Sequence, residues 1–437
     1  MLQLVLAGVF WAMFVGKISV GIAPFLALFL WLWSSYNLKI NQFLTGIPIF
    51  TFLGVLASGG MIGSEIMSVL VVFGLVLIYF SIFIIHKILV PKLTNFWQTL
   101  LFPSLFVLAD WVSAWLNPYG NWTVLAHSQY QNKELIQFLS VFGVWGISFL
   151  VSWSASVIVF FINTKSKIAL IYPLILVLVL GFGRIRLSQK SQNNFVQITS
   201  ISGKSLPQLF ENSIQNDNSK IVFWAEASGY VDQNKMPEII EQSKNIAKTR
   251  KIYFFPTFWI NNLDKQLPTN KVLGFDPDGN QILDYIKYRP IPGEGVQKGK
   301  DLPKSIEIKI GQETLKLAVA ICFDNDFVEI INQIDADILL QPSQDWAAID
   351  PKHTYNLSFR AIENGFSTIK QTNYGINQAT DYYGNVLAKT STKTMISQVP
   401  TKKIWTTYSV VRDIWICVCV LVVLIFTKLK LFKKKLA

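Results

Sequence analysis

The first 180 residues of this chain carry almost no charged side chains, and this constrains the fold more than any other feature of the sequence. A helix needs roughly 20 apolar residues to cross a bilayer. The apolar runs predict about seven N-terminal membrane helices and one C-terminal helix, at about 2–16, 18–35, 43–61, 66–86, 98–116, 136–162, 168–183 and 409–427. The composition agrees, with 51% hydrophobic and 15% charged residues and a mean hydropathy of +0.38.

These runs predict three parts: a membrane bundle at 1–184, a polar domain at 185–405, and a closing helix with a basic tail at 406–437. Loops with an excess of lysine stay on the cytoplasmic side of a membrane. With the N-terminus inside, ten lysines fall inside, namely Lys39, Lys87, Lys92, Lys165, Lys167, Lys428, Lys430, Lys433, Lys434 and Lys435. The outer loops between the predicted helices carry only Lys17 and Lys133. We therefore expect the polar domain to face outward.

Short β-rich runs alternate with helix-like segments in the polar domain. The runs are Phe195–Ile201, Lys220–Trp224, Lys251–Pro256, Val272–Asp276, Ile306–Ile310, Leu315–Ile321, Ile338–Gln341 and Phe366–Gln371, and the helical segments are Lys235–Arg250, Asn325–Ile334 and Lys352–Asn364. This alternation predicts a layered α/β domain. The sequence after Phe275, Asp-Pro-Asp-Gly, predicts a turn between two strands.

Three residues of this domain have the chemistry of a nucleophilic site. Cys322 follows an apolar strand, Glu226 ends another, and Lys287 ends a third strand-like run. A thiol attacks as thiolate, and it needs a base for its proton and a cation for the oxyanion that forms. Alone, each residue has a plainer interpretation: a buried inert thiol, a salt-bridge acid and a surface lysine. Together they predict a nucleophile, a base and an oxyanion partner.

Other functional classes receive little support from the sequence. Three cysteines do not make a disulfide framework, and no histidine stands at ligand spacing from another, so we expect no metal and no cofactor. The net charge of +12 is largely explained by lysines that set topology and by a tail near anionic lipid, and the basic residues are dispersed. We therefore expect no nucleic-acid partner.

The sequence around these residues resembles the carbon–nitrogen hydrolase (nitrilase) superfamily. The similar segments are Trp224-Ala-Glu226, Tyr285-Ile-Lys287, Ile321-Cys-Phe-Asp324, Pro342-Ser-Gln-Asp-Trp346 and Arg360-Ala-Ile-Glu-Asn364. The membrane half narrows the resemblance to the apolipoprotein N-acyltransferases, through Asn117-Pro-Tyr-Gly-Asn-Trp122, Ser128-Gln129 and the run at 136–150. The resemblance implies an α-β-β-α sandwich outside the membrane and a Glu226-Lys287-Cys322 triad.

The chain also departs from the family pattern. Ala225 stands where the family usually has proline, and Phe323 and Asp324 stand where tyrosine and glutamate commonly follow the nucleophile. The loop from Lys287 to Glu294 is one residue short. From the resemblance we expect Glu294, Phe323, Asp324 and Trp346 to support the site or position the substrate.

The resemblance implies an acyltransferase in a bacterial inner membrane, acting as a monomer without a cofactor. The expected reaction transfers an acyl chain from a phospholipid, through a thioester on Cys322, to the N-terminal amine of a diacylglyceryl lipoprotein. Two alternatives stay open: a membrane-tethered amidase that uses water, and a non-catalytic lipoprotein-binding protein.

Overall fold

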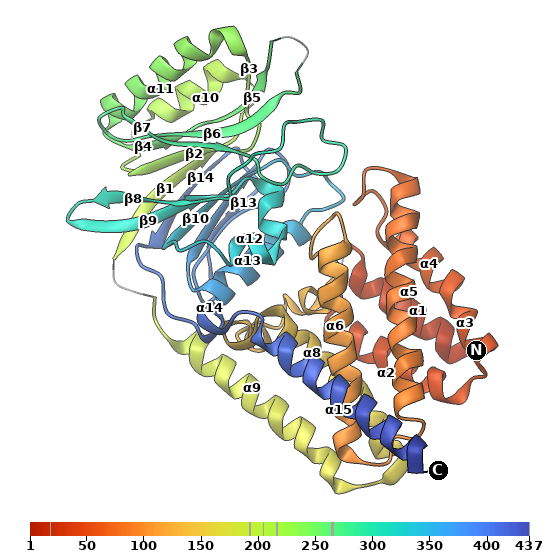
Figure 1. The fold of residues 1–437 in the computed structure, drawn as a ribbon. Helices are drawn as coiled ribbons and strands as arrows, with labels where there is room; N and C mark the ends of the chain where they lie inside the picture. Colours follow the sequence, from red (N-terminus) through yellow and green to blue (C-terminus); the bar gives the residue numbers. More distant parts are fainter. Residues whose placement is uncertain (18, 192–193, 204, 216, 264–265, 437) are drawn as a thin grey trace. The chain divides into compact units, whose positions relative to one another are not determined.

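The computed structural model describes residues 1–17, 19–191, 194–203, 205–215, 217–263 and 266–436. The chain forms two compact units: Met1–Gln189 with Val410–Ala437, and Lys190–Ser409 (Figure 1). The first unit is helical, and the second combines helices with two β-sheets.

Each predicted apolar run contains a helix of the first unit. The helices are α1 (Leu2–Val15), α2 (Ala23–Asn37), α3 (Ile40–Leu44), α4 (Gly46–Ala57), α5 (Glu65–Leu89), η1 (Phe96–Leu100), α6 (Leu101–Leu116), η2 (Leu125–Gln129), α7 (Lys133–Ile136), α8 (Leu139–Thr164), η3 (Lys167–Leu170), α9 (Ile171–Ser188), α14 (Thr407–Val411), which crosses into this unit, and α15 (Ile414–Leu436).

Six helical stretches of the described chain are long and apolar enough to cross a membrane: Ile40–Ala57, Glu65–Leu89, Phe96–Leu116, Leu139–Thr164, Lys167–Ser188 and Ile414–Phe432. This differs from the predicted count, because α1 and α2 have only 14 and 15 residues. At 1.5 Å per residue they fall short of a hydrocarbon core of about 30 Å. The start of α2 at Ala23 follows from Pro24, which favours the first turn of a helix. The chain is a multi-pass membrane protein.

One buried carboxylate connects several helices of the bundle. Asp110 of α6 accepts hydrogen bonds from the hydroxyl of Tyr79 at 2.7 Å and that of Ser148 at 2.7 Å. It also accepts one from the backbone N–H of Leu125 at 3.1 Å. An acid among membrane helices must have such partners. Asp110 therefore joins α5, α6, α8 and η2.

The loops of this unit gather at two ends, as alternating helices require. Hydrogen bonds between loops or helix ends join Lys87 to Leu38 and Asn163 to Leu93 at one end, and Lys17 to Ala57 and Gln129 to Gly21 at the other. Where the chain leaves the bundle, Arg186 contacts Gln137, and where it returns, Trp145 donates to Asp413.

The second unit contains two sheets. The eight-stranded sheet has the order β14-β1-β2-β4-β6-β5-β3, with β7 paired to β6, and the six-stranded sheet has the order β13-β12-β11-β10-β9-β8. The strands are β1 (Phe195–Ile201), β2 (Ile221–Trp224), β3 (Gly229–Asp232), β4 (Tyr253–Phe255), β5 (Thr257–Asn261), β6 (Thr269–Phe275), β7 (Gln281–Ile286), β8 (Ser305–Ile310), β9 (Glu313–Val319), β10 (Ile338–Ser343), β11 (Ser367–Thr372), β12 (Asn377–Thr380), β13 (Val386–Thr390) and β14 (Thr394–Pro400).

The sheets pack face to face and helices cover their outer faces (Figure 1). The helices of this unit are α10 (Leu206–Ile214), η4 (Gln233–Lys235), α11 (Met236–Arg250), η5 (Cys322–Asp326), α12 (Val328–Ile331) and α13 (Lys352–Asn364). Helices α10 and α11 cover the larger sheet, and α12 and α13 cover the smaller one. The expected α-β-β-α sandwich is confirmed.

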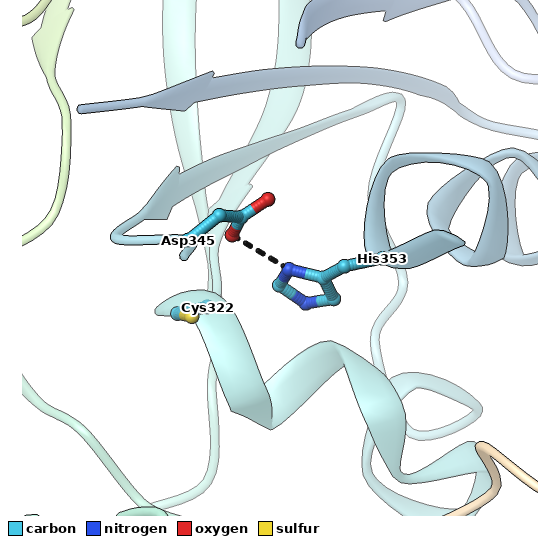
Figure 2. A group of neighbouring side chains, drawn as sticks. All are labelled: Cys322, Asp345 and His353. Atoms are coloured by element: carbon cyan, nitrogen blue, oxygen red, sulfur yellow. Dashed lines mark hydrogen bonds and ion pairs between the residues drawn. The ribbon is translucent and has the colours of Figure 1, made fainter. Parts of the chain in front are cut away.

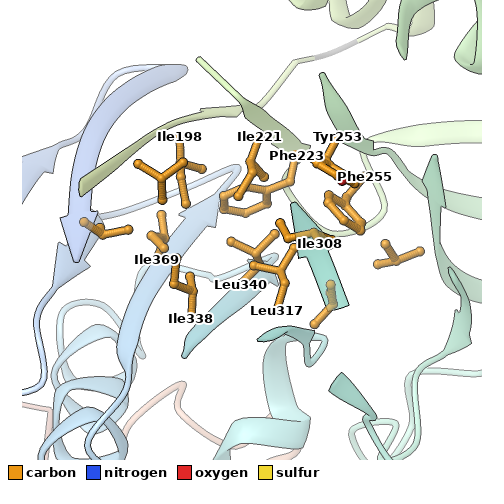
Figure 3. Close-up of a cluster of buried hydrophobic side chains, with 14 of the residues drawn as sticks. Ile198, Ile221, Phe223, Tyr253, Phe255, Ile308, Leu317, Ile338, Leu340 and Ile369 are labelled. Carbon is orange, nitrogen blue, oxygen red and sulfur yellow. The ribbon is translucent and has the colours of Figure 1, made fainter. Parts of the chain in front are cut away.

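Alternating side chains of β2 explain why both faces of the larger sheet are covered. Ile221 and Phe223 belong to the core between the sheets, which Figure 3 shows. Val222 and Trp224 belong to a second core, with residues of α10 and α11. All four are fully buried, and each such burial contributes about 1.5–3 kcal/mol. The end of β2, which carries Glu226, is thereby held on both faces.

Every predicted strand of this domain is present, within a few residues, and so is the turn between β6 and β7. Helices α11 and α13 also match the prediction. The helix predicted at Asn325–Ile334 is wrong: only Val328–Ile331 is α-helical, after the 3-10 turn η5. The side chain of Asn325 donates to the carbonyls of Ala320 and Cys322 instead, and such bonds compete with a helix.

Candidate active site

Glu226 is placed by the end of β2 and by contacts with the other sheet. Its backbone N–H donates to the carbonyl of Ser343 at 3.2 Å, and its carbonyl accepts from Asn373 at 3.0 Å. Ser343 ends β10 and Asn373 directly follows β11, so both partners lie where strands of the six-stranded sheet end. These bonds hold the backbone of Glu226 at the sheet ends. Its side chain is only 3% exposed.

Lys287 follows β7, and its ammonium lies between two carboxylates. Lys287 Nζ is 2.6 Å from Glu226 Oε1, and 2.9 and 2.8 Å from the two oxygens of Glu294. The backbone N–H of Ile291 holds Glu294 from the other side, at 2.7 Å. The short loop therefore brings the carboxylate of Glu294 into contact with the ammonium of Lys287.

Asn270 of β6 is a site residue that the sequence analysis missed. Its side-chain amide donates to Glu226 at 2.8 Å and to Glu294 at 3.2 Å. Its backbone carbonyl accepts from the N–H of Lys287 at 2.9 Å. Asn270 thus contacts both acids and the strand end that carries the lysine. The sequence signal that could have revealed Asn270 was the β6–β7 hairpin, which makes Asn270 and Lys287 neighbours.

Cys322 begins η5, three residues after β9 ends. Its backbone is left-handed, with φ of 46°, a conformation that costs energy for a residue other than glycine. Its carbonyl accepts from Gln341 at 3.1 Å and from Asn325 at 3.3 Å, which compensates for this geometry. The residue is 1% exposed. The strand end and the turn therefore hold the buried cysteine in one position.

Asp324 connects the cysteine turn to the lysine loop. One carboxylate oxygen accepts from the hydroxyl of Tyr285 at 2.7 Å and from the N–H of Ile321 at 3.0 Å, and the other from the N–H of Arg289 at 2.7 Å. Burial raises the pKa of Asp324 to about 6, although these three donors favour the charged form. Asp324 therefore links the cysteine turn to Tyr285 and to the loop that follows Lys287.

The charges around Cys322 determine its resting state. Burial, followed by the charge of Glu226, raises the pKa of the Cys322 thiol well above its usual value, against the opposing effect of Lys287. Burial alone would lower the pKa of Lys287, but Glu226, Cys322 and Glu294 raise it overall. These shifts favour a neutral thiol at Cys322 and a charged ammonium at Lys287.

Two aromatic residues expected near the site have different surroundings. Phe323 is buried and packs edge-on against Phe327, with ring centroids 5.1 Å apart. Trp346 is half-buried in the turn after β10. Both positions agree with packing roles.

Two charged side chains, Asp345 and His353, lie close to Cys322 and to each other. One ligand-type atom from each of Cys322, Asp345 and His353 lies within 4.8 Å of the others (Figure 2). His353 is eight residues after Asp345 in the chain, so the histidine spacing considered in the sequence did not reveal this group. Lys370 of β11, with no exposed surface, donates to Asp345.

The second unit is a two-sheet sandwich that buries Glu226, Lys287 and Cys322, and the first unit is a bundle of apolar helices. Residues 7–157 match the family model described as the apolipoprotein N-acyltransferase N-terminal domain. The chain is therefore similar to that family over residues 7–157 and, over most of its length, to acyltransferases named apolipoprotein N-acyltransferase.

Relatives match over most of the chain. Apolipoprotein N-acyltransferase of Rickettsia typhi is 26% identical over 340 residues, 68% of this chain and 68% of that protein. The Vibrio vulnificus protein of the same name is 24% identical over 408 residues, 82% of this chain and 79% of its own. Among solved structures, a carbon–nitrogen hydrolase from Helicobacter pylori has a TM-score of 0.40 at 14% identity, covering 47% of this chain and 89% of its own. An amidase from Nesterenkonia has a TM-score of 0.41 at 16% identity, covering 51% and 98%.

Proposed function

We propose that this enzyme N-acylates the N-terminal diacylglyceryl cysteine of bacterial lipoproteins, with a phospholipid as acyl donor. The observation that carries the proposal is the buried ammonium of Lys287, held by Glu226 and Glu294, in the same domain as the buried Cys322 at its strand end. Glu226, Cys322 and Lys287 can then serve as base, nucleophile and oxyanion partner. Similarity to the apolipoprotein N-acyltransferases and the bundle of apolar helices support lipid-anchored substrates.

In the first step Glu226 takes the proton of the Cys322 thiol, and the sulfur attacks an ester carbonyl of the phospholipid. Lys287 stabilises the oxyanion, because its raised pKa keeps it charged. The tetrahedral intermediate collapses, the C–O bond breaks, and the proton on Glu226 passes to the leaving alkoxide. A lysophospholipid departs and a thioester remains on Cys322.

In the second step the free α-amine of the lipoprotein attacks the thioester carbonyl. Glu226 takes a proton from the amine, Lys287 again holds the oxyanion, and the C–S bond breaks to give an amide. The proton then returns to the sulfur and restores the thiol. Because both substrates are anchored in lipid, a site borne by a membrane bundle meets them by lateral diffusion, which favours their encounter.

We propose that the catalytic domain faces the periplasm of a bacterial inner membrane and that one chain suffices for activity. The loop contacts support this orientation, since the end of the bundle with Lys17 and Lys133 is also where α9 leaves and α15 returns. Arg184 and Arg186, near the end of α9, add two positive charges at the outer end of the bundle. The ten lysines assigned to the inner side still outnumber the basic residues of this end.

Incubation of the purified protein with a phospholipid and a synthetic diacylglyceryl lipopeptide tests the proposal. The lipopeptide is expected to gain the mass of one acyl chain on its α-amine, and the Cys322→Ala protein should leave it unchanged. If the phospholipid is hydrolysed and the lipopeptide stays unmodified, the amidase or hydrolase alternative replaces this function.

A further inference from the structure

Four buried charged side chains form a cluster behind the cysteine turn. His353 Nδ1 lies 2.8 Å from Asp345 Oδ1, and His353 Nε2 lies 3.3 Å from Asp326 Oδ2. Lys370 Nζ donates to Asp345 and, at 2.8 Å, to the hydroxyl of Thr354. Figure 2 shows His353, from the start of α13, and Asp345 approaching Cys322. The mechanism proposed above uses none of these four residues.

The cluster is neutral overall, which explains how it can be buried. Burial and Lys370 lower the pKa of His353, but Asp345 and Asp326 outweigh them and raise it to about 9. Burial raises the pKa of Asp345, but Lys370 and His353 lower it overall to about 2. Two carboxylates thus face an imidazolium and an ammonium. Lys370 already supplies the positive charge that a metal ion would bring to Asp345, so the Cys-Asp-His grouping is better explained without a metal.

The cluster holds a short segment that contacts two members of the triad. This segment, Ser343–Asp345, follows directly from the end of β10. The carbonyl of Ser343 accepts from the N–H of Glu226 at 3.2 Å. The N–H of the next residue, Gln344, donates to Cys322 and lowers its thiol pKa. The third residue, Asp345, is the one bound by His353 and Lys370.

A second route runs from the cluster to the cysteine turn itself. The amide nitrogen of Gln341 lies 3.4 Å from His353 Nε2 and donates to the carbonyl of Cys322 at 3.1 Å. Asp326, the other partner of His353, lies in the same 3-10 turn as Cys322. The cluster therefore contacts both segments that surround the sulfur.

We infer that His353 and Lys370 are positioning residues for the nucleophile: with Asp326 and Asp345 they hold the Ser343–Asp345 segment so that the Gln344 N–H meets the sulfur as it loses its proton. The inference rests on Cys322 being the nucleophile of the proposed function, but on neither substrate. Loss of the cluster leaves the triad residues in place and makes the sulfur harder to ionise.

The test measures how fast iodoacetamide alkylates Cys322 from pH 6 to pH 10, by peptide mass, in a Cys417→Ser/Cys419→Ser background and without lipid. Lys370→Met and His353→Gln are expected to slow alkylation at pH 8 by about tenfold, as the loss of one hydrogen bond to a thiolate implies, and to move the midpoint of the pH profile upward. Lys370→Arg keeps the charge and should recover most of the rate.

Two further variants separate positioning from stability. Lys370→Met combined with Asp345→Asn leaves neither residue charged without a partner, and it decides the question if the single variants do not fold. It should still alkylate slowly, because the neutral pair no longer fixes the segment. Arg250→Met is the matched control: it removes an ion pair with Asp217, 2.9 Å long, in the same domain, and should lower thermal stability with an unchanged pH profile.

The inference is overturned if the folded cluster variants, the double variant included, show the wild-type pH profile, or if Arg250→Met shifts that profile equally. Failure of the proposed function gives a different result from failure of this inference. In that case the wild-type protein acquires no acyl group from phospholipid, while the alkylation differences between variants persist.

Discussion

Lys287 Nζ lies 2.6 Å from Glu226 Oε1, so the proposed oxyanion partner and the proposed base form one ion pair that is almost completely buried. Removing one partner of such a pair leaves an uncompensated charge, which typically costs about 3–5 kcal/mol. Glu294, 2.8 Å from the same ammonium, provides a second counter-charge. The site therefore tolerates proton movement on Glu226, because Lys287 keeps a carboxylate partner throughout.

Cys322→Ala should abolish lipopeptide acylation, by at least about a thousandfold, since no other group takes the place of a missing nucleophile. Folding should persist, because the lost sulfur resembles one buried methylene-sized group, worth about 1 kcal/mol. Acylation assays together with thermal denaturation in detergent check both halves. Wild-type-like acylation by this variant would exclude Cys322 as the nucleophile.

Glu226→Gln and Lys287→Met should each reduce acylation by several orders of magnitude, roughly a thousandfold or more, because residues that act as a unit fail together. The double variant should be little worse than either single one. Turnover with saturating substrates provides the measurement. If the rate loss in the double variant equals the product of the two single losses, Glu226 and Lys287 do not act as a unit.

Asn270→Ala should lower the turnover rate roughly ten- to hundredfold, since Asn270 donates to both Glu226 and Glu294 and hydrogen bonds to charged groups are strong. KM for the lipopeptide should change little. Asn262→Ala in the preceding loop is the control: the amide of Asn262 donates to the carbonyl of Leu267 at 2.6 Å and contacts neither acid. Equal losses in the two variants would count against a role for Asn270 in the site.

We expect the titration of Asp324 to make the activity depend on pH. Its pKa is raised to about 6 by burial, so the carboxylate becomes protonated as the pH falls through that value and loses acceptor capacity for Arg289 and Ile321. Activity should therefore fall below about pH 6. In Asp324→Asn this acid limb should disappear while activity at pH 8 is lower than wild type. A variant that keeps the same limb would assign it to another group.

Topology is tested with reporter fusions. A periplasmic reporter placed after Lys298 should be active, and one placed after Lys434 should be inactive. A cytoplasmic reporter should give the opposite pattern. Cytoplasmic activity of the fusion at Lys298 would reverse the proposed orientation, and the lipoprotein substrate would be excluded with it.

Much of the fold follows from local patterns in the sequence. Strands such as β1 and β9 are short apolar runs, and α13 has a clear amphipathic period. The helix predicted around Asn325 failed because side-chain bonds to the backbone replaced helical ones. The start of α2 differs from the prediction because apolar composition does not reveal where a helix begins, and Pro24 favours a start at Ala23.

The site was predictable where one strand end carries one reactive residue, as with Glu226, Lys287 and Cys322. It was not predictable where the contact is made across strands or sheets. Asn270 meets the acids only through the β6–β7 pairing. Asp345, His353 and Lys370 meet only when β10, α13 and β11 pack together, which no local pattern in the sequence shows.

The most direct measurement of the central claim is the mass of the Cys322 peptide after the purified protein is incubated with phospholipid alone. The account predicts a stoichiometric acyl adduct, released by hydroxylamine and discharged by a diacylglyceryl lipopeptide with a free amine, as ping-pong chemistry requires. The same lipopeptide with an acetylated amine should leave the adduct in place, because its nitrogen lone pair is delocalised into the amide. Absence of an adduct, or discharge by water as fast as by the lipopeptide, would contradict the account.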